Sequence, residues 1–104
     1  MNYVDRIAAE IEHQLAPADR PSHRAGDLYR LYALLVLTTG KQTSLENVHD
    51  AWSTWMADQD PRHQSLIPFC DLRPEQQEQD RPYLEAVLRV AEQISQRPPA
   101  STNV

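Results

Sequence analysis

Residues 28–37 read LYRLYALLVL, and this stretch decides the fold. Nine of its ten residues are apolar and only Arg30 is charged, so a helix built from them has no side suited to water. Asp27 is a suitable N-cap for such a helix, which we expect to reach Thr39. Gly40 then stands where a left-handed residue commonly ends a helix. We therefore expect the central, buried helix of a small all-α domain here.

Three further helices are predicted around the central one, over residues 3–16, 44–57 and 81–96. Each carries apolar side chains at helical spacing, which indicates one buried face. Thr43 and Glu46 are spaced as in a capping box, in which two side chains satisfy free backbone N–H groups at a helix start. The sequence thus predicts an all-α fold with four main helices.

The segment before the last helix, residues 58–73, is expected to be irregular because Pro61 and Pro68 forbid a continuous helix. Loops longer than about 12–15 residues are uncommon in compact domains unless they pack tightly or bind something. This segment contains several apolar residues, so we expect a long ordered loop that folds back over the core. Pro74 then favours a short helical turn, and Asp80 is expected to cap the last helix.

Length and composition are those of one soluble domain. We expect the 104 residues to form a single domain over 1–96, followed by a disordered tail over 97–104. No apolar run approaches the roughly 20 residues that cross a bilayer, and the N-terminus does not resemble a signal peptide. Cys70 is the only cysteine, which excludes an intramolecular disulfide and favours the cytoplasm.

The charge distribution disfavours nucleic-acid binding. The net charge is −5, and Lys41 is the only lysine, whereas phosphate backbones are bound by clustered Lys and Arg. One alternative stays open, because residues 31–55 have the outline of a helix-turn-helix. Its second helix offers Glu46 and Asp50 but neither Lys nor Arg, so DNA binding is the disfavoured alternative. The expected partners include no nucleic acid and no membrane.

No residue pattern indicates catalysis or metal binding. The four histidines lie in four different segments, without the short spacings of zinc ligands: His13, His23, His49 and His63. His49 and Asp50 are neighbours on a helix and do not face each other, which argues against an acid–base pair. Cys70 lies in an apolar stretch, where a buried structural cysteine is expected. We predict a protein that is not an enzyme and carries no metal or cofactor.

Three short motifs carry a family resemblance over about residues 45–90. They are His49-Asp50-Ala51-Trp52, then His63-x-x-Leu66-Ile67-Pro68-Phe69-x-x-Leu72, then Asp80-Arg81. This order resembles the RyR domain, the repeat named after ryanodine receptors and also found in bacterial and phage proteins. The chain is also similar to small proteins of actinobacteria and their phages. Ser65 stands near a position where the RyR family often has Pro.

The resemblance implies a small non-catalytic binding module that recognises a protein partner or a nucleotide-like ligand, in phage–host interaction. RyR repeats occur in tandem in the receptors, whereas this chain has one copy. We therefore expect a homodimer, in which a second subunit takes the place of the second repeat. The expected site combines the aromatic helix with the loop after it and the start of the last helix: His49, Trp52, Trp55, His63, Pro68, Phe69, Asp80 and Arg81. The alternative is a structural or inhibitory protein-interaction domain without a ligand.

Overall fold

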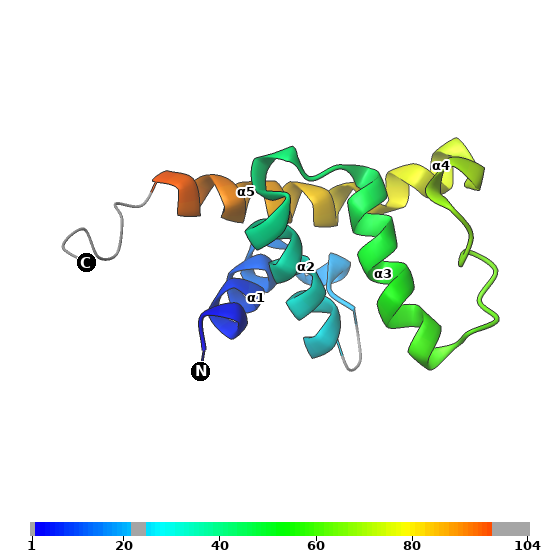
Figure 1. Ribbon diagram of the computed structural model, residues 1–104, viewed down its shortest axis with the longest axis horizontal. Helices are drawn as coiled ribbons and strands as arrows, with labels where there is room; N and C mark the ends of the chain where they lie inside the picture. The colour runs from blue at the N-terminus through cyan, green and yellow to red at the C-terminus, as the bar shows by residue number, and fades with distance from the viewer. Residues whose placement is uncertain (1, 22–24, 97–104) are drawn as a thin grey trace.

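The computed structural model describes residues 2–21 and 25–96, and in these ranges the chain forms helices and no strand. Four long helices, which confirm the predicted all-α class, carry the fold (Figure 1). They are α1 (Tyr3–Gln14), α2 (Gly26–Thr38), α3 (Leu45–Gln59) and α5 (Arg81–Gln96). Short turns of helix join them: η1 (Pro17–Asp19), η2 (Gly40–Gln42), η3 (Phe69–Asp71), α4 (Pro74–Gln77) and η4 (Glu78–Asp80). The predicted disordered tail, residues 97–104, lies outside the described residues.

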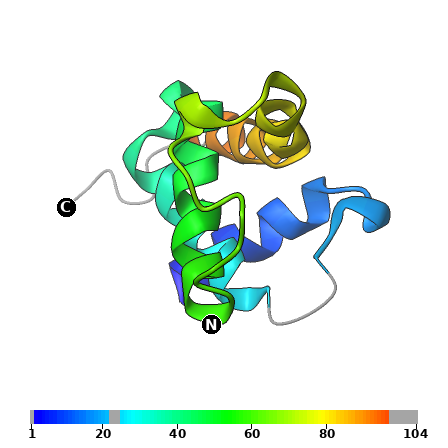
Figure 2. The same cartoon turned by 90° about the vertical axis from the view of Figure 1, so that its right-hand side faces the viewer.

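Helix α2 is central, as expected, because it packs against α1, α3 and α5 (Figures 1 and 2). The face that it buries holds Leu28, Tyr29, Tyr32, Ala33 and Val36. The expectation that no side of this helix would meet water is wrong, because Leu34 is 51% exposed and Leu37 is 44% exposed. Three neighbouring helices do not enclose a fourth completely in a domain this small. No helix in the described ranges is long and apolar enough to span a bilayer.

Most of the core lies between α1, α2 and α5, Val48 and Ala51 of α3 also belong to it, and it is built from apolar side chains. Ile11 of α1 and Val87 and Val90 of α5 have no exposed surface. Tyr29 adds a buried hydroxyl without a hydrogen-bond partner among the described residues, and burial is the main cause that raises its pKa to about 12. The phenol therefore stays neutral at ordinary pH, and this core contains no buried charge.

The predicted end of α2 is confirmed, but its predicted start is wrong. Gly40 has φ +54°, which places it in the left-handed region expected at a helix end. At the other end the N-cap is Ala25, which has no capping side chain. Asp27 lies in the first turn instead, where its carboxylate is 3.1 Å from the Arg30 guanidinium.

The capping box of α3 is present, but one residue later than predicted. Ser44 is the N-cap, and its hydroxyl accepts a hydrogen bond from the Asn47 N–H. The Asn47 side chain in turn accepts one from the Ser44 N–H at 2.9 Å. Thr43 is occupied elsewhere, because its hydroxyl donates to the Gly40 carbonyl at 2.7 Å. The extra 3₁₀ turn after α2 therefore moves the start of α3 and takes Glu46 out of the capping position.

The loop after α3 is ordered, as predicted, and it returns along α3 to reach α4 (Figure 2). Hydrogen bonds from His63 N–H to the Asp60 carbonyl and from Leu66 N–H to the His63 carbonyl hold its turns. Its packing is uneven, because Leu72 is 6% exposed whereas Ile67 is 39% exposed.

Helix α5 spans the predicted residues, Arg81–Gln96, but its start is not capped as predicted. Pro74 occupies the first turn of α4, as expected. Asp80, however, is the last residue of η4, and the next residue, Arg81, already has helical dihedral angles. No hydrogen bond from a described residue reaches the Asp80 carboxylate, so its predicted role as a helix cap is wrong. The Asp80 carboxylate is therefore not used in capping α5.

Candidate ligand-binding site

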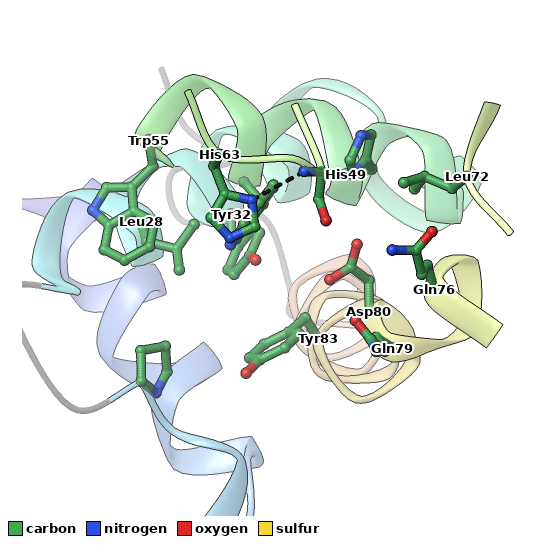
Figure 3. A pocket seen from close by; sticks show the side chains of 13 residues that line it. Leu28, Tyr32, His49, Trp55, His63, Leu72, Gln76, Gln79, Asp80 and Tyr83 are labelled. Carbon is green, nitrogen blue, oxygen red and sulfur yellow. Dashed lines mark hydrogen bonds between the residues drawn. The ribbon is translucent and has the colours of Figure 1, made fainter. Parts of the chain in front are cut away.

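A cavity of about 380 Å³ lies between α3, the loop after it and the start of α5 (Figure 3). Its lining is aromatic, polar and, to a lesser extent, aliphatic. The lining residues are Tyr32, Trp52, Trp55 and Tyr83, then His49, His63, Ser65, Gln76, Gln79 and Asp80, then Pro21, Leu28 and Leu72. Pockets for small molecules typically measure about 300–1,000 Å³, so this one suits a small ligand.

Aromatic rings from α3 and the loop form one wall of the cavity. Trp52 and Trp55 are three residues apart on α3 and so share a helix face. The His49 ring lies 5.8 Å from the Trp52 ring at an interplanar angle of 23°, and the His63 ring meets Trp52 edge-on at 5.1 Å. Both tryptophans of the chain are only partly buried, which leaves ring surface for a ligand.

Two histidines hold this wall in place. The His49 ring is buried, and its Nε2 lies 2.7 Å from the Ile67 carbonyl oxygen. A carbonyl oxygen only accepts, so Nε2 carries the hydrogen and donates it. In the loop, Nδ1 of His63 accepts a hydrogen bond from the Ser65 N–H at 3.0 Å. His49 therefore ties the loop to α3, and His63 stabilises a turn within the loop.

Asp80 faces this wall from the end of η4 (Figure 3). Its carboxyl is half-buried, and no described residue donates a hydrogen bond to it. Burial raises the pKa of Asp80 above its ordinary value, and the nearby His49 opposes that shift only in part. A carboxylate that is partly desolvated and unpaired costs free energy in the folded protein.

Two tyrosines complete the cavity on the side of α2 and α5. Tyr32 has no exposed surface, and its hydroxyl has no hydrogen-bond partner among the described residues. Burial, with a contribution from the Asp80 charge, raises its pKa well above the ordinary value. The Tyr83 ring lies 5.8 Å from the Tyr32 ring, and its hydroxyl donates to the Asp19 carbonyl at 2.6 Å. That bond fixes η1 against the start of α5.

The structure brings together most of the site that the sequence predicts. The members that line the cavity are His49, Trp52, Trp55, His63 and Asp80. They come from three segments that are distant in the sequence, and the fold places them around one space.

The remaining predicted site residues do not line the cavity. Pro68 precedes η3, and the Phe69 ring packs at 6.2 Å against His49. Arg81 is exposed and pairs with Glu78 at 2.8 Å. Cys70 is exposed, so the prediction of a buried cysteine is wrong. In the described ranges, no group of three or more His, Cys, Asp or Glu residues is placed to hold a metal ion.

Sequence reasoning missed Tyr32, Tyr83, Gln76 and Gln79. Both tyrosines fit an apolar helical stripe, and nothing in the stripe separates a core residue from one that also lines a cavity. Gln76 and Gln79 lie in the short turns before α5, where a polar residue is the ordinary choice. Only the packing of η4 against α3, and of α4 against η4, reveals their position.

Fold and cavity together define a small all-helical domain with an aromatic, acidic pocket at one end. The sequence profile of DUF7701, described as a domain of unknown function, matches residues 2–92, and the chain belongs to this family. No curated protein and no solved structure matches the chain. The matched region contains every residue that lines the cavity. The RyR resemblance stays a prediction.

Proposed function

We propose that the chain is a small non-catalytic binding module that holds a small ligand with a flat, nucleobase-like ring. The observation that carries this proposal is the cavity itself, which both tryptophans of the chain line beside an unpaired carboxylate. Stacking of a base on an aromatic side chain contributes about 1–3 kcal/mol, and it tolerates different bases. The polar groups at the other end of the cavity would orient such a ring.

The RyR resemblance supports the same reading, because its motif residues His49, Trp52, His63 and Asp80 meet at this cavity. A nucleotide-like ligand is also what the resemblance implies. We place the module in the cytoplasm, where the exposed Cys70 thiol would stay reduced. A role in phage–host interaction is part of this proposal.

A second candidate function is protein recognition without a ligand, through a surface that adjoins the first. A hollow of about 490 Å³ lies between α2 and α3, and Leu31, Leu34 and Trp55 are among its lining residues. Leu34 is 51% exposed there, and an exposed apolar side chain beside a hollow is a common feature of interaction surfaces. The partner would be another protein or a second copy of the chain.

Titration with nucleosides and cyclic dinucleotides tests the ligand proposal, with tryptophan fluorescence and calorimetry as readouts. Because both tryptophans line the cavity, a bound ring should change the emission in a saturable way. Trp55→Ala should weaken binding about tenfold or more, whereas Leu37→Ala, on the exposed face of α2, should leave it unchanged.

Saturable binding that Trp55→Ala leaves intact would reject this site. If no compound produces a response, the protein-recognition alternative takes its place. Pull-down with wild-type and Leu34→Asp chains, and the molar mass in solution, then test that surface. Loss of a captured partner or of a dimer in the variant would support it.

A further inference from the structure

The charge inside the cavity is one-sided. Asp80 is the only carboxylate that lines it, and neither Lys nor Arg is present among the described lining residues. The nearest arginine in sequence, Arg81, is engaged with both carboxylate oxygens of Glu78 at the surface. The whole chain has a net charge of −5, so its field attracts cations as well. A phosphate group would therefore meet repulsion from Asp80 and find no Lys or Arg among the described lining residues.

The ring faces around Asp80 are also suited to a cation. Trp55 comes from α3 and Tyr83 from α5, and in Figure 3 Asp80 lies beside Tyr83, while Trp55 lies on the opposite side of the cavity. Aromatic faces carry partial negative charge and attract organic cations within about 6 Å of the ring centre. A carboxylate beside such faces adds charge-assisted hydrogen bonds to any N–H group of the same cation.

A second, independent observation is an unpaired hydroxyl group at the cavity. The Tyr32 side chain lines the cavity and has no exposed surface, yet its hydroxyl has no hydrogen-bond partner among the described residues. Buried hydroxyl groups are nearly always paired in folded proteins. Two polar side chains of the cavity, Asp80 and Tyr32, thus have no hydrogen-bond partner among the described residues. A ligand with two N–H groups would donate one to the Asp80 carboxylate and the other to the Tyr32 oxygen, which a small movement of the covering side chains would have to expose.

We propose that the ligand is a small organic cation, a flat ring that bears an amidinium, guanidinium or protonated amine group. Its N–H groups bind Asp80 and Tyr32, and its ring lies against Trp55 and Tyr83. This inference rests on the proposed function, since it assumes that the cavity holds a small flat ligand. The inference adds that the ligand carries a positive charge. We therefore expect organic cations to bind most tightly, uncharged nucleosides less tightly, and nucleotides most weakly.

Benzamidine and benzamide test the charge directly, because they have nearly the same shape and differ by one positive charge. Fluorescence of Trp52 and Trp55 reports binding of either compound. In the wild-type chain we expect benzamidine to bind at least about tenfold more tightly than benzamide. Asp80→Asn should reduce that ratio to about one while benzamide still binds. Asp50→Asn, the same change at an exposed position of α3, should leave the ratio unchanged.

The outcomes separate this inference from the proposed function. Equal affinities in the wild type, or a preference that survives in Asp80→Asn, would overturn the cation inference. If benzamide or nucleosides bind as tightly as benzamidine, the cation inference is overturned but the proposed function stands. No response to benzamidine, benzamide or any nucleoside would reject both. Adenosine and its monophosphate give a check that needs no variant, since the phosphate should weaken binding.

Discussion

The two ends of the domain bury different kinds of side chain. Between α1, α2 and α5 the interior is apolar apart from the Tyr29 hydroxyl, with Ile11, Val87 and Val90 fully enclosed. Between α3 and the start of α5 the interior holds a cavity, a half-buried carboxyl and the unpaired Tyr32 hydroxyl. The first arrangement stabilises the fold, whereas the second costs stability. Such a cost typically persists where a site serves function, so the comparison places stability at one end and binding at the other.

The largest effect is expected from the apolar end. Ile11→Ala removes a fully buried side chain and leaves a void among α1, α2 and α5, so the free energy of unfolding should fall by about 2–5 kcal/mol. Urea denaturation followed by circular dichroism measures this change. A loss below about 1 kcal/mol would mean that Ile11 is not part of a tightly packed core, and the comparison would weaken.

His49 connects the two ends, and its replacement should have a smaller effect. His49→Ala removes a buried ring and the hydrogen bond to the Ile67 carbonyl, so we expect a loss of about 1–3 kcal/mol. Hydrogen exchange should rise most in the loop, residues 61–68, because the bond fixes that loop to α3. Uniformly faster exchange over the whole chain would instead show that His49 supports the fold globally.

At the cavity end, one substitution should raise stability. The pKa of Asp80 is raised in the folded protein, so the native state binds more protons than the unfolded state near and above the ordinary value of 3.8. The free energy of unfolding therefore falls as the pH rises through that window. Asp80→Asn removes this penalty and should increase Tm by a few degrees at pH 7, with a much smaller gain at pH 4.

Calorimetry at the two pH values checks this prediction. The Asp50→Asn variant is the control, because its carboxylate is exposed and should contribute little. A lower Tm for Asp80→Asn at pH 7 would show that the carboxylate stabilises the fold, against the assignment of Asp80 to binding.

The smallest effect is expected at Arg81, which belongs to the predicted site but not to the cavity. Its pair with Glu78 is solvent-exposed, and such pairs contribute about 0–1 kcal/mol. Arg81→Ala should change stability by less than about 0.5 kcal/mol and leave benzamidine binding intact. A tenfold loss of benzamidine affinity in Arg81→Ala would show that Arg81 contributes to ligand binding after all.

The sequence predicts the helices well because hydrophobic periodicity repeats over many residues and averages out single exceptions. The ends of the helices are harder to predict. The 3₁₀ turn η2 (Gly40–Gln42), for example, moves the N-cap of α3 from the predicted Thr43 to Ser44. The exposure of Leu34 was not predictable, since it depends on how many helices surround α2. Within the site, motif residues such as His49 and Asp80 were found, but their common cavity results from packing between distant segments.

Tyr32 shows the same limit at the level of one residue. Its ring fits the apolar pattern of α2, and the sequence gives no sign that its hydroxyl would lack a partner. Arg81 shows the converse, because a motif position next to Asp80 points to the surface and pairs with Glu78. A sequence motif therefore indicates candidate site residues, whereas their burial and hydrogen-bond partners in the structure show which of them line the cavity.

The most direct test of the proposed cation site is a nuclear magnetic resonance titration with benzamidine, followed through the indole N–H signals. The chain has two tryptophans, Trp52 and Trp55, so two such signals report on the cavity. We predict that both shift saturably, that amides of α1 stay in place, and that Asp80→Asn weakens the affinity for benzamidine about tenfold or more, to the level of benzamide. Indole signals that stay fixed while amides around Leu34 shift would contradict it.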